Sequence, residues 1–145
     1  MTYARLTELT AKDDGKEVSV AGWVEDVRNL GGIAFVILRQ REGTLQLAVR
    51  KKENLAVFEV VAGLTRESVI AAKGTVKANA QARNGWEIFP SHVDVLSPAQ
   101  TPLPLGVVDK VGADMDTRLD NRVLDLRKPE KRAIFHVRDL IQRGI

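Results

Sequence analysis

Four side chains in this sequence have the chemistry needed to recognise an unstacked nucleic-acid base. Phe35 offers a flat ring for stacking, and Gln46 carries an amide that donates and accepts hydrogen bonds at the same time. Glu87 can accept a hydrogen bond from a base N–H, and Arg28 can pair with a phosphate or a base. Each also has a plainer interpretation, because Phe35 suits a protein core equally well and polar strand residues are more often simply solvated. Whether these residues bind a base or have only a structural role depends on the strands and loops that carry them.

The other residue types point away from catalysis and from metal binding. The sequence contains no cysteine, which excludes disulfides and thiolate metal sites. Its two histidines, His92 and His136, are too far apart in sequence and context to suggest a shared metal ion. The carboxylate pairs Asp13-Asp14 and Asp114/Asp116 are typical of turns and solvated loops, and no Walker-type or GxGxxG loop occurs. We therefore expect no catalytic residue, no cofactor and no metal site in this chain.

Positive charge is concentrated at the C-terminal end of the 145-residue chain. Residues 1–117 hold 14 Lys and Arg against 15 Asp and Glu, whereas residues 118–145 hold 8 against 4. The N-terminal part is nearly neutral, so any nucleic-acid binding there must depend on specific side chains rather than on bulk attraction. The N-terminus has no apolar signal core, and no run is long enough to span a membrane. We therefore expect a cytoplasmic globular protein.

Hydrophobic patterns predict an all-β domain with one inserted helix. Five strands are expected at residues 17–27, 32–39, 44–50, 67–78 and 86–96, with the helix within residues 51–64. This is the element order of the five-stranded OB-fold barrel, and a small sandwich or an SH3-like barrel is the structural alternative. Gly22 and Gly74 would let their strands coil sharply enough to close the barrel. Pro90 indicates a sheet edge or a bulge in the last strand.

The same alternation predicts which way the candidate side chains face. On the first strand, one face should carry Val18, Val20, Gly22, Val24 and Asp26. On the second strand, inward-facing even-numbered residues would leave Phe35 on the outer surface. Gln46 alternates with Leu45 and Leu47 and should also point away from the core. OB barrels bind single-stranded nucleic acid across strands two and three, so the four candidates could converge on that face.

A different kind of segment follows the predicted barrel. Residues 98–106 contain three prolines and cannot continue a sheet, and residues 117–127 combine three Arg, three Leu and two Asp. Pro129 fits the first turn of a helix that has an apolar stripe and reaches the end of the chain. We expect three parts: an OB domain at residues 1–97, a hinge at residues 98–128, and the truncated start of a further domain at residues 129–145.

Ordered motifs spread over about 110 residues carry a family resemblance. They are Ala21-Gly22-Trp23-Val24, Arg28-Asn29-Leu30-Gly31-Gly32-Ile33, Arg41-Glu42-Gly43, Gly85-Trp86-Glu87-Ile88-Phe89-Pro90, Thr101-Pro102-Leu103-Pro104-Leu105 and Thr117-Arg118-Leu119-Asp120-Asn121-Arg122. On these residues the whole chain resembles the N-terminal anticodon-binding domain of archaeal-type aspartyl-tRNA synthetases, class II enzymes that attach aspartate to tRNA. The asparaginyl enzymes are close relatives, but the stretches RLDNR (residues 118–122) and LDLR (residues 124–127) favour the aspartyl branch.

The resemblance implies a role for each candidate. In the family, the aromatic residue matching Phe35 stacks on the central anticodon base, a uridine, and the residues matching Gln46 and Glu87 read the edge of that base. The arginine matching Arg28 helps to hold the anticodon loop. The expected partner is therefore the aspartate tRNA, and acceptance of the asparagine tRNA is left open.

The resemblance also implies what the chain does not contain. The helix from Pro129 looks like the start of the first class II motif, which forms the dimer interface in the family, so a homodimer is expected for the parent enzyme. The motifs that bind ATP and Mg²⁺ would lie beyond residue 145. We expect the parent to be an ATP-dependent aspartate–tRNA ligase, and this fragment to bind tRNA without aminoacylating it.

Two further positions bear on which tRNA is accepted. The position matching Glu25 commonly carries Trp or His in archaeal relatives and helps to decide whether the asparagine tRNA is accepted, and Glu fits neither pattern. Arg83 lies in a loop that neighbours the first anticodon base in relatives. Two other functions stay open: a stand-alone, non-enzymatic OB-fold RNA-binding protein, and an engineered OB-fold binding scaffold. Retention of Phe35, Gln46 and Glu87 argues against the scaffold.

Overall fold

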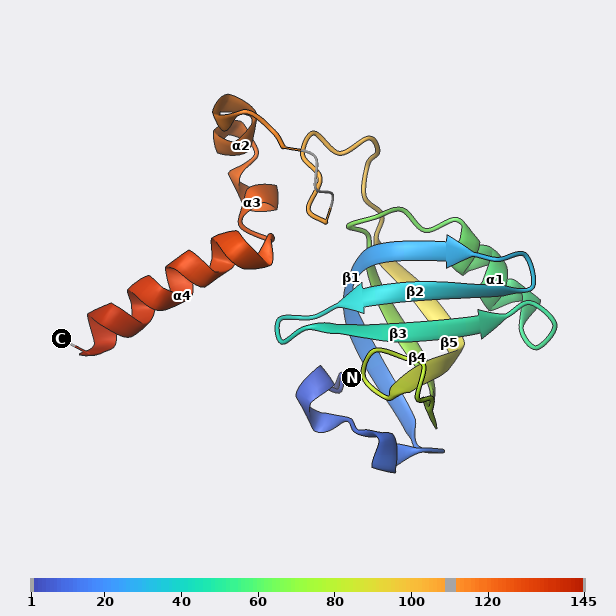
Figure 1. Ribbon diagram of the computed structural model, residues 1–145. Helices are drawn as coiled ribbons and strands as arrows, with labels where there is room; N and C mark the ends of the chain where they lie inside the picture. The colour runs from blue at the N-terminus through green and yellow to red at the C-terminus, as the bar shows by residue number, and fades with distance from the viewer. Residues whose placement is uncertain (1, 109–111, 145) are drawn as a thin grey trace. The chain divides into compact units, whose positions relative to one another are not determined.

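The computed structural model describes residues 2–108 and 112–144 and shows a closed five-stranded barrel followed by helices (Figure 1). The elements of the barrel domain are η1 (Leu6–Glu8), η2 (Ala11–Asp13), β1 (Glu17–Asn29), β2 (Ile33–Arg39), β3 (Thr44–Arg50), α1 (Leu55–Ala62), β4 (Val69–Ala78) and β5 (Trp86–Ser97). Around the barrel the strand order is β1-β2-β3-β5-β4, and β4 closes the ring by pairing with β1. The predicted element order and OB barrel are confirmed.

A single parallel contact joins β3 to β5 in the barrel. It is short and has Leu47 opposite Ile88, whereas the other neighbouring strands pair in antiparallel fashion. A hairpin cannot join parallel neighbours, so the chain crosses over through α1 and β4 between them. This contact brings Gln46 on β3 close to Glu87 on β5.

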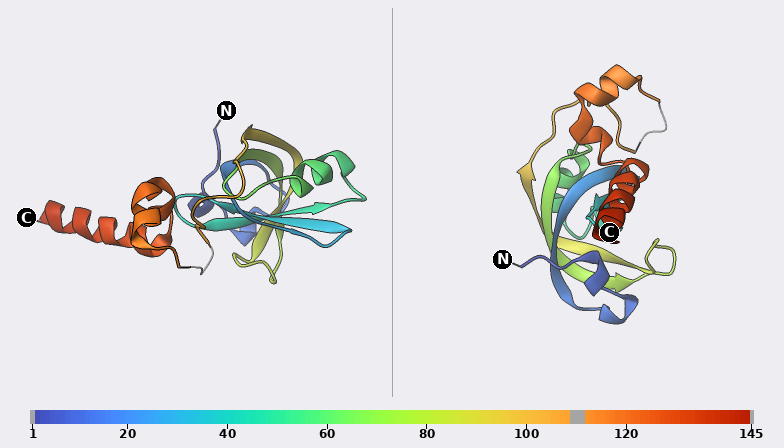
Figure 2. Two further views of the ribbon diagram at one scale, coloured as in Figure 1. Left: turned by 90° about the horizontal axis from the view of Figure 1, so that it is seen from above. Right: turned by 90° about the vertical axis from the view of Figure 1, so that its left-hand side faces the viewer.

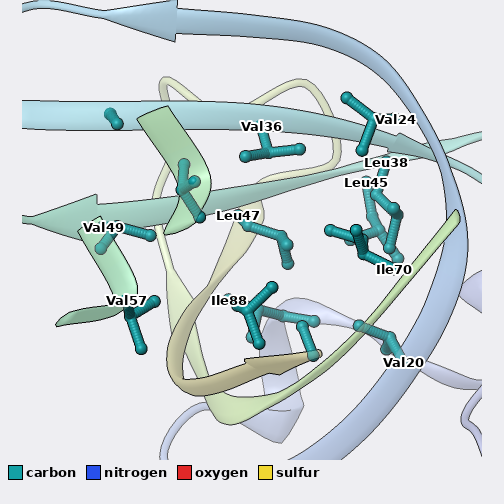
Figure 3. Packing of buried hydrophobic residues seen from close by; sticks show 14 of the residues in the cluster. Val20, Val24, Val36, Leu38, Leu45, Leu47, Val49, Val57, Ile70 and Ile88 are labelled. Carbon is teal, nitrogen blue, oxygen red and sulfur yellow. The ribbon is translucent and has the colours of Figure 1, made fainter. Parts of the chain in front are cut away.

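Apolar side chains that alternate along the strands fill the barrel (Figure 3). The labelled residues are Val20, Val24, Val36, Leu38, Leu45, Leu47, Val49, Val57, Ile70 and Ile88. All of them are buried, and burial of such a side chain stabilises the fold by roughly 1.5–3 kcal/mol. Helix α1 packs against β2, β3 and β5, and it begins at Leu55 because the side chain of Asn54 accepts a hydrogen bond from the Val57 N–H at 3.1 Å. The helix predicted within residues 51–64 is confirmed.

A β-bulge at Glu25 reverses the alternation near the end of β1. The pairing of β1 with β2 shifts register between Val24 and Asp26. Beyond the shift, Val27 packs against the core, and Asp26 pairs with arginines at the surface. The predicted common face of the first strand is therefore wrong at Asp26, because the extra residue turns each later side chain to the opposite face.

Strands β4 and β5 come unusually close where Gly74 faces Pro90. A Cβ atom on Gly74 would lie 2.6 Å from the Cα atom of Pro90 and 2.8 Å from the carbonyl carbon of Phe89, so only glycine fits there. The register of the two strands also shifts beside this pair, between Lys73 and Gly74. The bulge that Pro90 indicated in the sequence is confirmed.

From Thr101 onward the chain forms a second compact unit. Its helices are α2 (Met115–Asp120), α3 (Arg122–Asp125) and α4 (Pro129–Gly144), and α4 is a single continuous helix in Figure 2. Two short helices thus form within the segment expected to be a hinge. Buried Asp125 holds them together, because Arg118 donates hydrogen bonds to its two carboxylate oxygens at 3.1 and 3.3 Å. The functional division of the chain at residues 97 and 128 stays a prediction.

Candidate nucleic-acid interface

Phe35 lies on the outer surface of the barrel, in a row that crosses three strands. In the register of the sheet it is opposite Arg28 on β1 and Ala48 on β3. Burial alternates strictly along β2, so that Ala34 and Val36 are buried while Phe35 is partly exposed. The partly exposed ring of Phe35, beside the small and buried Ala48, provides a flat surface on which a base can stack.

Gln46 and Glu87 form a hydrogen-bonded pair where β3 meets β5. Nε2 of Gln46 donates to Oε2 of Glu87 at 2.7 Å, and Nδ2 of Asn79 donates to Oε1 of Glu87 at 2.8 Å. Both carboxylate oxygens of Glu87, which is 5% exposed, are therefore bonded to amides. Because an ionised carboxylate only accepts hydrogen bonds, the Gln46 amide must turn its nitrogen towards Glu87. Its oxygen and its second N–H then remain for other partners.

The β4–β5 loop, residues 79–85, is bonded to the barrel beside this pair. Asn79 holds the Glu87 carboxylate from one end of the loop. Near the other end, Nδ2 of Asn84 donates to the backbone oxygen of Thr44, at the start of β3, at 2.8 Å. Arg83 is exposed in the same loop, so these bonds place it near the start of β3, on the Gln46 side of the barrel.

The surface next to Glu87 is hollowed. The hollow has a volume of about 480 Å³, and its lining residues are Arg50, Glu53, Lys77, Ala78, Asn79, Glu87 and Phe89. The guanidinium carbon of Arg50 lies 5.0 Å from the centroid of the Phe89 ring, and Nη1 of Arg50 pairs with Oε1 of Glu53 at 2.8 Å. Two cations and an aromatic ring suit the phosphate and sugar of a single strand.

Arg28 is held at the surface by Asp26. Nε of Arg28 donates to Oδ2 of Asp26 at 3.2 Å, and Nη2 of Arg66 donates to Oδ1 at 2.9 Å. Desolvation raises the pKa of Asp26, but the hydrogen bonds from Arg66 and Arg28 outweigh it and hold the pKa below its ordinary value. Asp26 is therefore charged at neutral pH, and Arg28, with 71% of its side chain exposed, presents a cation beside Phe35.

Glu25 lies apart from Phe35. Its carboxylate is 3.8 Å from Nη1 of Arg39, the last residue of β2, and Arg39 also donates to buried Glu67 at 2.7 Å. Arg39 is four residues further along β2 than Phe35, which is about 13 Å. The structure thus gathers the four base-reading candidates on one face of the barrel and places Glu25 in a separate ion-pair network.

Three residues that build this face were overlooked in the sequence: Asn79, Arg50 and Phe89. Phe89 could have been predicted from the sequence, because it is two residues from Glu87 on β5 and therefore lies on the same face. Arg50 follows the same alternation on β3. Asn79 could not have been predicted, since an asparagine in a polar loop is typical of a turn, and only its bond to Glu87 distinguishes it.

Residues 2–108 and 112–144 contain neither a metal-binding cluster nor a helix suited to cross a membrane. Across these two ranges, no cluster of three or more His, Asp or Glu side chains could hold a metal ion. None of the helices that the structure describes there combines the length and the apolar character that a membrane span requires.

The closed barrel, with aromatic and amide side chains on its outer face, defines a class of protein. In OB barrels this face binds single-stranded nucleic acid. Residues 18–96 match the family described as the OB-fold nucleic acid binding domain, and the chain belongs to that family.

Its relatives are aminoacyl-tRNA synthetases. The aspartate–tRNA(Asp/Asn) ligase of Methanopyrus kandleri is 50% identical over 98% of this chain and 33% of its own length. The aspartate–tRNA(Asp) ligase of Pyrococcus horikoshii is 45% identical over 95% of this chain and 32% of its own. Among solved structures, the asparaginyl-tRNA synthetase from Pyrococcus horikoshii matches 96% of this chain and 32% of that one, with a TM-score of 0.85 at 28% identity. The chain spans about a third of the length of the curated relatives it matches.

Proposed function

We propose that this chain recognises the anticodon of a tRNA, as the anticodon-binding part of an aspartate–tRNA ligase. The observation that carries the proposal is the Gln46–Glu87 pair beside the partly exposed ring of Phe35, on the outer face of an OB barrel. The relatives supply the substrate class, since ligases named for the aspartate tRNA match nearly the whole chain.

The geometry favours uracil over cytosine as the base stacked on Phe35. With its nitrogen held by Glu87, Gln46 presents its oxygen as an acceptor and its second N–H as a donor. Uracil offers an N3–H donor next to a carbonyl acceptor, which matches this pattern. Cytosine offers an unprotonated N3 next to an amino donor, which opposes acceptor to acceptor and donor to donor. A reversed amide would suit cytosine only by turning its oxygen towards the Glu87 carboxylate.

Cations around the pair can hold the sugar–phosphate backbone. Arg28 extends from β1 beside the stacking ring, and Arg50 and Lys77 line the hollow next to Glu87. Phosphate contacts position a strand without reading its sequence, whereas hydrogen bonds to a base edge read the base. Affinity and selectivity therefore depend on different side chains of the same face.

The proposal assigns aminoacylation to the rest of such an enzyme. The aspartate–tRNA ligase would bind ATP and Mg²⁺ outside residues 1–145, work in the cytoplasm as a homodimer, and rely on this chain for tRNA binding. Glu25 and Arg83 are proposed to influence whether the asparagine tRNA is accepted in addition to the aspartate tRNA. Arg83 has the better position for this role, because the loop that carries it is bonded to the start of β3.

Binding of two anticodon stem-loops, identical except for U or C at the central anticodon position, tests the proposal. We expect the U stem-loop to bind roughly tenfold tighter or more, because the C stem-loop leaves mismatched polar groups. Phe35→Ala should weaken binding of the U stem-loop about 5- to 150-fold, which corresponds to roughly 1–3 kcal/mol of stacking. The control is Val95→Ala, at a 43%-exposed position eight residues further along β5 than Glu87. Equal affinities for U and C, or no loss with Phe35→Ala, would exclude anticodon recognition by this face.

A further inference from the structure

Asn79 provides the second amide on the Glu87 carboxylate and belongs to the β4–β5 loop. Nδ2 of Asn79 donates to Oε1 of Glu87 at 2.8 Å, while Oδ1 of Asn79 accepts from the backbone N–H of Gln81 at 2.9 Å. The orientation of this amide is therefore fixed on both sides. One continuous chain of hydrogen bonds runs from the loop backbone through Asn79 and Glu87 to Gln46.

Because Glu87 is buried, the hydrogen bond from Asn79 matters for the position of its carboxylate. Glu87 is 5% exposed, so water compensates little for a hydrogen bond that its carboxylate loses. The last side-chain torsion of a glutamate is soft, and a carboxylate held at one oxygen can turn about it. With Asn79 on Oε1, the other oxygen stays aimed at Gln46. The Gln46 amide keeps its orientation only while that oxygen faces it.

We propose that Asn79 is a positioning residue that sets base selectivity through Glu87. By holding the carboxylate, it locks the Gln46 amide in the orientation that accepts a hydrogen bond from a uracil N3–H. This inference rests on the proposed function and adds to it a loop residue that acts through another side chain. Loss of the Asn79 donor lets the carboxylate swing out of line with Gln46. Once no acceptor oxygen faces the Gln46 amide, the amide can reverse, so cytosine becomes acceptable while stacking and phosphate contacts persist. The signature is a loss of selectivity, not a uniform loss of affinity.

Asn84 offers a matched comparison within the same loop. Its side-chain amide also donates a hydrogen bond, to the backbone oxygen of Thr44 at 2.8 Å, and so anchors the loop to β3 without bonding Glu87. If Asn79 served only to keep the loop in place, removal of either anchor would affect binding in the same way. A difference between the two separates positioning of Glu87 from loop order.

The test measures the ratio of the affinities for the U and C stem-loops, with the full 145-residue chain. Asn79→Ala removes the donor without adding a charge, and Asn79→Asp keeps the acceptor for the Gln81 N–H but sets a second carboxylate against Glu87, which repels it. We expect Asn79→Asp and Asn79→Ala to lower the ratio about tenfold, and Asn84→Ala to keep it within about twofold of wild type. Urea unfolding of each variant establishes that the barrel is intact in the assay.

An unchanged ratio in the Asn79 variants, or an equal fall in Asn84→Ala, would overturn the positioning role. If Asn79→Asp does not fold, Asn79→Ala decides between the same two outcomes. A wild-type chain that binds both stem-loops equally contradicts the proposed function and the inference with it. A wild-type chain that prefers U, together with an Asn79 variant that keeps this preference, contradicts the inference alone.

Discussion

Arg28 and Phe35 face each other across the β1–β2 pair, a largely exposed guanidinium opposite a partly exposed ring. Cβ atoms of directly opposite residues in an antiparallel pair are about 5 Å apart, so a base stacked on the ring brings its phosphate within reach of the arginine. The bulge at Glu25 creates this relationship, because without the extra residue Arg28 would continue the inward-facing set of Val20 and Val24. The bulge at Glu25 thus places the positive charge of Arg28 next to the ring of Phe35.

Arg28→Gln should lower the salt dependence of stem-loop binding. One phosphate contact on a single strand contributes about 0.7 to the slope of log affinity against log salt concentration, so the slope should fall by about that amount. The U-to-C ratio should stay as in wild type, since a phosphate contact carries no base information. Titrations at several salt concentrations measure both quantities. Lys73→Gln is the control, because Lys73 lies on β4, away from β2 and β3, and pairs with Glu17 on β1 at 3.0 Å. A fall of equal size in the salt slope of Lys73→Gln would contradict a local role for Arg28.

Gly74→Ala should destabilise the barrel, because the new Cβ atom would meet the backbone of Phe89 and Pro90 and force β4 and β5 apart. We expect a loss of roughly 1–3 kcal/mol or more in the free energy of unfolding, measured with urea. Gly32→Ala is the matched control, since a Cβ atom there meets nothing within 4 Å, and it should change that free energy by less than about 1 kcal/mol. Equal effects of the two substitutions would contradict the importance of the close approach.

Most of the barrel follows from the sequence because its strands alternate locally. Strands β2 and β3 pair without a register shift, so the outward direction of Phe35 and Gln46 follows from their neighbours alone. The alternation fails at Asp26, since a bulge inserts a residue without a residue type that marks it. The helices α2 and α3 were likewise missed within the expected hinge, because the bonds between Asp125 and Arg118 that accompany them cannot be recognised from composition.

The arrangement of the candidate site depends on tertiary contacts that periodicity does not reveal. Gln46 and Glu87 are 41 residues apart and meet only because β3 and β5 make a short parallel contact. Residue type and alternation predicted both side chains as base-reading candidates, but they did not predict the hydrogen bond between them. Asn79 was not predicted as a site residue, because the Glu87 carboxylate approaches it only in the closed barrel.

Asp125→Asn should destabilise the helices α2 and α3 more at neutral pH than in strong acid. The hydrogen bonds from Arg118 hold the pKa of Asp125 below the ordinary value of 3.8. A carboxylate whose pKa is lowered by folding stabilises the folded state above its unfolded pKa, and this contribution is lost as the pH falls through the folded pKa. The helical circular dichroism signal should therefore melt at a lower temperature in the variant at pH 7, and this difference from wild type should shrink as the pH falls below 3.8 and through the folded pKa.

Asp120→Asn supplies the comparison for this pH effect. Asp120 is exposed at the end of α2, and its replacement removes the same charge from the helix next to α3, which carries Asp125. We expect its melting temperature to follow that of wild type at every pH. A pH-independent loss in Asp125→Asn would contradict the ion-pair explanation and indicate packing of the side chain instead.

Glu87→Gln should remove the preference between U and C. The amide that replaces the carboxylate can donate as well as accept, so it no longer forces the Gln46 nitrogen to face it. Both orientations of the Gln46 amide then become accessible, and each suits one of the two bases. The substitution also removes a negative charge from the face proposed to bind the RNA, which by itself should raise the affinity for either stem-loop.

Glu53→Gln controls for that charge, because Glu53 lines the same hollow and pairs with Arg50 at 2.8 Å without bonding Gln46. In the stem-loop titrations, Glu53→Gln should raise both affinities together and keep the U-to-C ratio of wild type. Glu87→Gln should bring the ratio to within about twofold of one, because the mismatch penalty disappears when the amide can reverse. A full wild-type ratio in Glu87→Gln would mean that the base is not read by an amide whose orientation the carboxylate sets.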